Sequence, residues 1–126
     1  MNRQALTVGT VLEADRGLYR HCGLVYGFRG SDPVVISNLP GGAQLQSVAQ
    51  FANGKEVRVV GYPSQFSSWQ VIARALSVAN RPYSWLSWNC EHLVNYAHGL
   101  RIESQQVNRW IALAGLVSVT VALAKA

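Results

Sequence analysis

Charged residues are scarce in this chain, and their scarcity excludes several classes of protein. Asp, Glu, Lys and Arg make up 13% of its 126 residues, about half of the usual quarter. Hydrophobic residues make up 49%, so the chain is too apolar for an intrinsically disordered protein. With 11 Gly and 4 Pro, it is neither collagen-like nor of low complexity. The length fits a single domain.

Acidic residues are fewer than basic residues in this chain. There are 6 Asp and Glu against 11 Lys and Arg, which gives a formal charge of +5. The basic residues form no run, and even the densest set, Arg16, Arg20 and Arg29, is dispersed. Nucleic-acid-binding proteins usually show a basic stripe with stacking aromatic residues. We therefore expect no nucleic-acid partner, whereas an anionic membrane surface is compatible with the charge.

Cysteine is also rare, with only Cys22 and Cys90. One possible disulfide is too few for a cystine-stabilised scaffold. The first ten residues contain no apolar run of the kind found in secretory signals. We expect a reducing, cytoplasmic location, in which a free cysteine is either an inert small hydrophobe or a nucleophile.

The first half of the chain is rich in β-forming segments separated by Gly, Pro and Asn turns. It predicts strands over residues 6–13, 18–26, 34–38, 43–48 and 56–60, with a short helical turn ending at Ala52. In the second strand, alternation places His21 and Gly23 on one face and Cys22 on the other.

Helical patterns follow Pro63. The predicted helices are one capped by Ser67 or Ser68 and ended before Pro82, one over 90–98 capped by Asn89 and stopped by Gly99, and one capped by Ser104. The last helix continues into an apolar tail at 110–124. Strands followed by helices predict an α+β domain, with an antiparallel sheet of about five strands and helices packed on one side.

Cys90 would be the first residue of the helix over 90–98. The unpaired amides and the dipole at a helix N-terminus favour a thiolate over a thiol. Leu93, Val94 and Ala97 share a helical face with Cys90 and should pack on the sheet. A buried cysteine without chemistry is the alternative.

A nucleophilic cysteine needs a base, and His21 is the best placed of three histidines. His92 lies roughly 200° around the helix from Cys90, and His98 is expected to be a solvated residue at the helix end. A buried core histidine is the alternative interpretation of His21. A zinc site of His21, Cys22, Cys90 and His92 is disfavoured because these side chains diverge on their elements. We expect no metal and no other cofactor.

Three segments resemble the lecithin:retinol acyltransferase-like family. Residues 89–94, Asn-Cys-Glu-His-Leu-Val, closely match its Asn-Cys-Glu-His-Phe box. Residues 19–27 are similar to its Tyr-x-His strand that ends in Tyr-x-Gly, and residues 104–107 to its Ser-x-Gln-Val. The resemblance covers about residues 8–108. It implies a circularly permuted papain-like fold, shared with NlpC-like peptidases, in which the histidine precedes the cysteine.

The resemblance also implies the roles of the site residues. It makes Cys90 the nucleophile and His21 the general base, and the Cys90 backbone amide a candidate for the oxyanion hole. Many members carry a second histidine on the next strand, where this chain has Ser37 and Asn38. Alignment with the Val-Ile-His-Asn pattern favours Ser37 as the third residue, with Asn38 as the alternative. Cys22 replaces a common aromatic residue, and we expect it to serve in packing.

The apolar tail sets the domain organisation. Residues 5–108 are the expected catalytic domain, and residues 109–126 an apolar C-terminal helix. At ~1.5 Å per residue, 110–124 spans about 22 Å, short of a ~30 Å hydrocarbon core. The segment is apolar on all sides, so membrane association, a homodimer interface and packing on the domain remain alternatives.

Three functions follow from these observations. The leading one is a thiol-dependent acyltransferase or lipid acyl hydrolase that acts on a phospholipid-type ester through a Cys90 acyl-thioester. A cysteine peptidase or amidase would use the same residues on an amide bond. A membrane-tethered interaction module with a degenerate site is the third, because the third residue is not a histidine.

Overall fold

Five antiparallel strands, three helices between residues 48 and 98, and a further helical segment at 105–109 build the part of the chain that the structure describes. This computed structural model describes residues 6–17, 20–100, 104–109 and 111. The strands are β1 (Val11–Asp15), β2 (Arg20–Arg29), β3 (Asp32–Leu39), β4 (Gly42–Ser47) and β5 (Val57–Gly61). The helices are α1 (Val48–Ala52), α2 (Ser68–Ser77) and α3 (Cys90–His98). The sheet has the order β4-β3-β2-β1-β5, so the α+β class and the five-stranded sheet are confirmed.

The first strand starts later than the sequence predicts. Residues 7–10 form a turn in which the Thr10 amide donates to the Thr7 carbonyl at 3.1 Å. Gly9 adopts a φ of +88° there, a conformation that favours glycine. The turn delays β1 to Val11, although Thr7 and Val8 have high β propensity.

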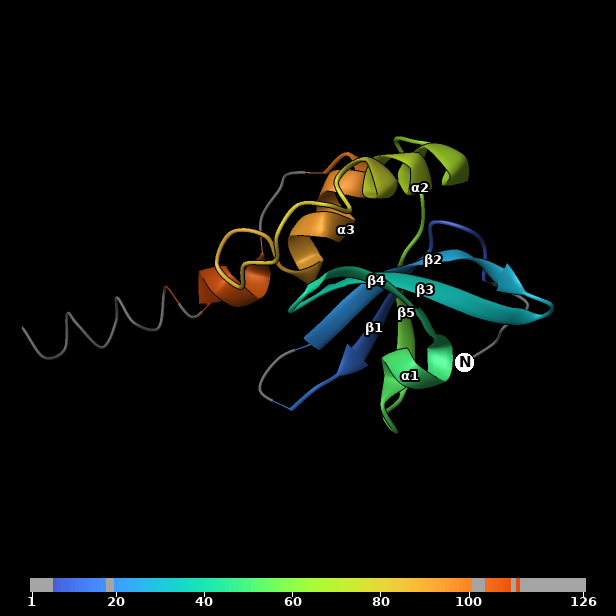
Figure 1. Ribbon diagram of the computed structural model, residues 1–126, viewed down its shortest axis with the longest axis horizontal. Coiled ribbons are helices and arrows are strands. Elements are labelled where there is room, and N and C mark those ends of the chain that lie inside the picture. Colours follow the sequence, from blue (N-terminus) through green and yellow to red (C-terminus); the bar gives the residue numbers. More distant parts are fainter. Residues whose placement is uncertain (1–5, 18–19, 101–103, 110, 112–126) are drawn as a thin grey trace, which may run out of the picture.

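The sheet separates two apolar clusters. The pair α2 and α3 covers one face of the sheet, and α1 lies on the other (Figure 1). Cys22 and Leu24 contribute to the cluster under α2 and α3, whereas Val25 packs in the cluster that contains Phe51 of α1. The predicted alternation in β2 is confirmed. The expectation of helices on one side only is wrong, because Phe51 gives α1 an apolar residue to bury on the opposite face.

Helix α3 has the predicted ends and the predicted buried face. Asn89 is the N-cap of α3, and Gly99 ends the helix with a φ of 75°. Cys90, Leu93, Val94 and Ala97 are all buried in the cluster under α2 and α3. Each Å² of buried apolar area contributes ~25 cal/mol to stability, so this buried face anchors the helix on the sheet.

The central strands β2 and β3 are paired over only part of their length. Their register runs from Leu24↔Ile36 to Arg29↔Asp32, so residues 20–23 lie beyond the end of the paired region. Gly23 permits the close approach at this point, since a Cβ there would lie 2.8 Å from the Ile36 carbonyl oxygen. Backbone groups of residues 20–22 that face β3 are thus left for other partners.

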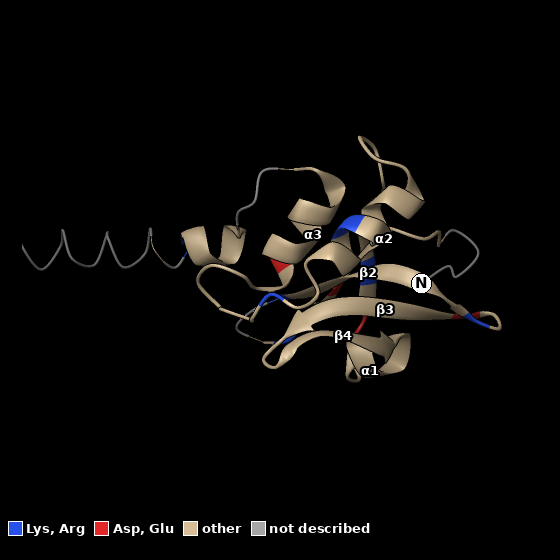
Figure 2. Cartoon of the chain, turned by 45° about the horizontal axis from the view of Figure 1, so that its top comes forward, with Lys and Arg blue, Asp and Glu red and all other residues tan. Residues whose placement is uncertain are grey.

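The predicted C-terminal tail, 110–124, lies outside the described residues except for Ile111. Within the described ranges, no helix has the length and apolar character needed to cross a bilayer. Lysine and arginine are spread over separate elements, and the tip of the β2–β3 hairpin carries both signs of charge (Figure 2).

Candidate active site

The start of α3 is held by reciprocal hydrogen bonds. The Asn89 side-chain oxygen accepts from the Glu91 amide at 2.9 Å and from the His92 amide at 3.3 Å. In return, Nδ1 of His92 accepts from the Asn89 amide at 2.9 Å. This capping box uses the second and third amides of the helix and leaves the Cys90 amide outside the cap.

The Cys90 sulfur lies against the unpaired end of β2. Its Sγ accepts a hydrogen bond from the Cys22 amide at 3.4 Å and lies 3.9 Å from the Arg20 carbonyl oxygen. Both backbone groups point within the plane of the sheet, toward the side where β3 has diverged. The sulfur therefore takes the position of a missing strand partner for the Cys22 amide.

The surroundings of Cys90 favour its thiolate. A hydrogen bond from the Cys22 thiol is the largest cause that lowers the pKa of Cys90, to about 5. Burial opposes this shift, and a side-chain hydrogen bond with His21 and the Cys22 amide add to it. The same contact raises the pKa of Cys22, because its proton is held against the Cys90 sulfur, and burial raises it further. The opposite directions of the two shifts make Cys90 the more acidic thiol of the pair.

His21 approaches the sulfur from the α1 face of the sheet. Its ring lies 4.9 Å from the ring of Phe51, measured between centroids. The side chain is 3% exposed, and its Nε2 has no hydrogen-bond partner. A buried ring nitrogen without a partner is costly, which suits a histidine retained for its chemistry. The nitrogen that would normally bind an orienting side chain is unoccupied.

The two candidates for the third residue lie on opposite faces of β3. Ser37 is on the same face as Val35, which packs in the α1 cluster, and it therefore shares the face of His21. Its hydroxyl donates to Oε1 of Gln46 at 3.3 Å. Asn38 is on the other face and donates to the Trp88 carbonyl at 2.7 Å. Ser37 has the right face for the role, and Asn38 fixes the loop before Cys90.

Glu91 and Gln106 join helix α3 to the C-terminal segment. The Glu91 carboxylate accepts from the Ser104 hydroxyl at 3.0 Å, from the amides of Gln105 and Gln106 at 3.0 and 3.3 Å, and from Nε2 of Gln106 at 2.8 Å. The Gln106 side chain also binds the backbone of Arg20 like a strand partner, with Nε2 to oxygen and Oε1 to nitrogen both at 2.8 Å. Sequence reasoning did not find these contacts, although the paired motifs at 89–94 and 104–107 contain all the residues involved.

The two remaining histidines have structural roles. His92 points away from the sulfur as expected, and its ring stacks on Trp88 with centroids 6.4 Å apart. Burial lowers the pKa of His92 and keeps Nδ1 an acceptor. The expectation that His98 is solvated is wrong. It is 4% exposed, and its Nε2 lies 2.7 Å from the Gly9 carbonyl oxygen, because the turn at 7–10 folds over the end of α3.

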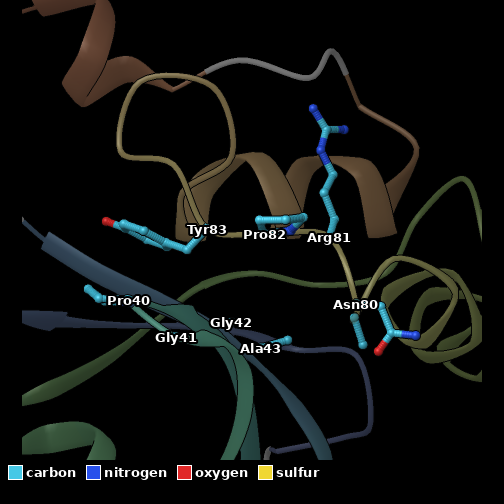
Figure 3. Close-up of a pocket in the computed structure, with 9 residues that line it drawn as sticks. Pro40, Gly41, Gly42, Ala43, Asn80, Arg81, Pro82 and Tyr83 are labelled. Atoms are coloured by element: carbon cyan, nitrogen blue, oxygen red, sulfur yellow. The ribbon is translucent and has the colours of Figure 1, made fainter.

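A cavity of about 700 Å³ lies on the α2 and α3 side of the sheet. Its lining comes from the β3–β4 turn at 40–43 and from residues 79–83, and it includes neither Cys90 nor His21. Tyr83 and Pro82 face the turn, while Arg81 points away from it (Figure 3). The Arg81 guanidinium instead lies 4.0 Å from the centroid of the Trp88 ring. The cavity is therefore separate from the thiolate.

No cluster of three or more His, Cys, Asp or Glu side chains suited to a metal ion occurs within the described ranges. No protein-family model matches the chain, and no match is found among curated proteins. The chemistry of this site must therefore be argued from its own geometry.

Proposed function

We propose that this protein is a thiol-dependent acyltransferase or lipid acyl hydrolase, with the permuted papain-like fold of lecithin:retinol acyltransferase-like proteins. One observation carries the proposal. The Cys90 sulfur lies at the first residue of α3, against the open end of β2, with hydrogen bonds that stabilise its thiolate. His21 is the neighbouring residue on that strand, and its side chain helps to lower the pKa of Cys90.

The meeting of three distant motifs supports this assignment. Asn89 and His92 cap the helix that presents Cys90. Glu91 binds the segment 104–106, and Gln106 binds the Arg20 backbone beside His21. Each residue of the Asn-Cys-Glu-His box thus acts at the same place, which supports a common origin for the resemblance better than chance similarity does.

The proposed reaction is acyl transfer in two halves. His21 takes the proton of the Cys90 thiol, the sulfur bonds to the ester carbonyl carbon, and the carbonyl electron pair moves to oxygen. When the carbonyl re-forms, the alkoxide leaves and takes the proton that His21 holds. Water, an alcohol or an amine then attacks the thioester and gives a proton to His21, and Cys90 leaves as a thiolate. The Cys90 amide, outside the Asn89 cap, is the donor available to the oxyanion.

The unpartnered Nε2 of His21 favours a second candidate, an interaction module with a degenerate site. Without a side chain on that nitrogen, only the sulfur and the packing against Phe51 orient the imidazole. A neutral Ser37 cannot stabilise an imidazolium as a carboxylate does. The two candidates differ in turnover. An enzyme with a weakly oriented His21 would turn over slowly, whereas the interaction module would not turn over at all.

The experiment is intact-protein mass spectrometry after incubation with phosphatidylcholine micelles. Acyl transfer predicts a fatty-acyl adduct on Cys90 that hydroxylamine removes, and no adduct on the Cys90→Ser variant. An adduct obtained only with an activated amide substrate would select the peptidase or amidase. If no adduct forms on a folded protein whose Cys90 is shown to be reduced, the interaction module is the remaining candidate.

We also propose that the apolar tail brings this site to lipid. Ser104 and Val107 are buried, so the domain extends at least to residue 107. A chain that ends at Arg109 should fold and keep activity on a short water-soluble ester. It should lose sedimentation with anionic liposomes, because each buried CH₂ contributes about 0.8 kcal/mol to membrane binding. A truncated protein that changes from dimer to monomer and still binds liposomes would make the tail an oligomer interface.

A further inference from the structure

The second cysteine of the chain contacts the proposed nucleophile directly. The Cys22 amide nitrogen lies 3.4 Å from the Cys90 sulfur, and both side chains are free thiols buried in the same apolar cluster. In the acyl-transfer mechanism the Cys22 thiol helps to lower the pKa of Cys90 but takes part in no bond-forming step.

Both cysteines are held in place by rigid backbone. Cys22 pairs with Glu13 in the ladder between β1 and β2, and Cys90 is fixed by the Asn89 cap. The Cys22 Cα is one bond from the amide that touches the sulfur, so its side chain begins close to Cys90. Disulfides need Cα atoms within about 4.4–6.8 Å, and the 3.4 Å contact of the Cys22 amide with the Cys90 sulfur makes the two residues direct neighbours.

We propose that Cys22 and Cys90 form a two-thiol oxidation site whose oxidant is a hydroperoxide. The Cys90 thiolate attacks one peroxide oxygen, the O–O bond breaks, and water or an alcohol leaves once it has taken up a proton. Cys90 is then a sulfenic acid. The Cys22 sulfur attacks the Cys90 sulfur and gives up its proton, and the hydroxyl departs as water. The two thiols supply the two electrons that reduce the peroxide, and the product is the Cys22–Cys90 disulfide.

Cys22 becomes able to lose its proton when Cys90 has been oxidised, which is the step at which its sulfur must attack. Its pKa is raised chiefly by the hydrogen bond to the Cys90 sulfur. Oxidation of Cys90 to the sulfenic acid removes the thiolate that holds this proton, so Cys22 can ionise and attack. Before that step Cys22 stays protonated, which leaves Cys90 as the sulfur that meets the peroxide first.

The disulfide would block the nucleophile and protect it. A thiolate without a resolving thiol is oxidised further, to sulfinic and sulfonic acids that ordinary thiols do not reduce. A disulfide is returned to two thiols by exchange with a small dithiol. This inference needs a reactive Cys90 thiolate but no acyl transfer, so it stands or falls separately from the proposed function.

The test treats full-length protein with increasing hydrogen peroxide, quenches it with acid, and maps the peptides without reduction. We expect loss of two hydrogen atoms from the intact mass and a cross-link between the Cys22 and Cys90 peptides, both reversed by dithiothreitol. Sulfinic acid on Cys90 of the wild type, formed without a cross-link, would overturn the proposal. So would a cross-link found only between two chains.

Two variants sharpen the result. Cys22→Ser and Cys22→Ala should accumulate Cys90 sulfinic acid at peroxide doses that leave the wild type fully recoverable. Thiol-blocking kinetics on Cys90 report recovery directly and need no enzyme assay. Equal recovery of Cys90 in the wild type and in both variants would show that Cys22 does not resolve the sulfenic acid. The wild-type peptide map decides the question even where a variant fails to fold.

Discussion

The two halves of the candidate site differ in how completely their polar groups are satisfied. On the side of Cys90, Asn89, Glu91 and His92 all have partners that fix the start of α3, and Asn38 binds the preceding loop through Nδ2 while its buried Oδ1 has no partner. On the base side, the buried Nε2 of His21 has no partner, and Ser37 donates to Gln46 instead. Buried polar groups are nearly always paired. The contrast teaches that this chain holds the start of α3, where Cys90 lies, more firmly than it orients the ring of His21.

Substitutions on the side of Cys90, at the start of α3, should have the largest effect on stability. Glu91→Gln should lower the free energy of unfolding by about 1.5–3 kcal/mol, because it removes the charge that holds four hydrogen bonds from residues 104–106. Urea denaturation measures the change. Glu56→Gln, in an exposed segment, is the matched control and should change stability little. An equal loss in both variants would mean that Glu91 does not clamp the C-terminal segment.

Substitutions on the side of His21 should have a smaller effect. Ser37→Ala tests whether the Ser37 hydroxyl turns from Gln46 to Nε2 of His21 during turnover. If it does, turnover should fall by up to about tenfold, since a neutral hydrogen bond contributes about 0.5–1.5 kcal/mol. Asn38→Ala should instead lower stability, because Asn38 binds the loop before Cys90 from the opposite face. Comparison of turnover with melting temperature separates the two. Loss of turnover on a stable Asn38→Ala protein would assign the third position to Asn38.

The smallest expected effect is a pH dependence on the side of Cys90. Burial holds the pKa of His92 below its usual 6.5. Its contribution to stability is therefore complete above pH 6.5 and is lost as the pH falls through the lower, folded value. Protonation would also end the acceptance by Nδ1 from the Asn89 amide. The slope from this single group is at most about 1.4 kcal/mol per pH unit.

His92→Gln tests this pH dependence, because glutamine can complete the capping box but does not titrate. Unfolding at pH 7 should be little changed, and the loss of stability between pH 6.5 and 5 should shrink. Identical pH profiles for the variant and the wild type would show that His92 does not titrate with folding.

Much of this comparison could be predicted from the sequence. The cap, the first-turn cysteine and the buried face of α3 follow from local spacing, so Asn89, Cys90 and Leu93 behave as expected. Contacts between distant elements could not be predicted. The Cys22–Cys90 contact depends on where β3 leaves β2, and the burial of His98 depends on the turn at 7–10. Neither of these contacts can be predicted from the hydrophobic periodicity of the sequence.

The central claim is that Cys90 is a stabilised thiolate and Cys22 its protonated neighbour. The most direct measurement is the rate of iodoacetamide labelling of each cysteine in the native protein against pH. With a Cys90 pKa of about 5, labelling of Cys90 should already level off well below pH 8.5, the value of an ordinary thiol, while Cys22 stays unlabelled. A Cys90 rate that keeps rising through pH 8.5, or a Cys22 that labels faster, would contradict the account.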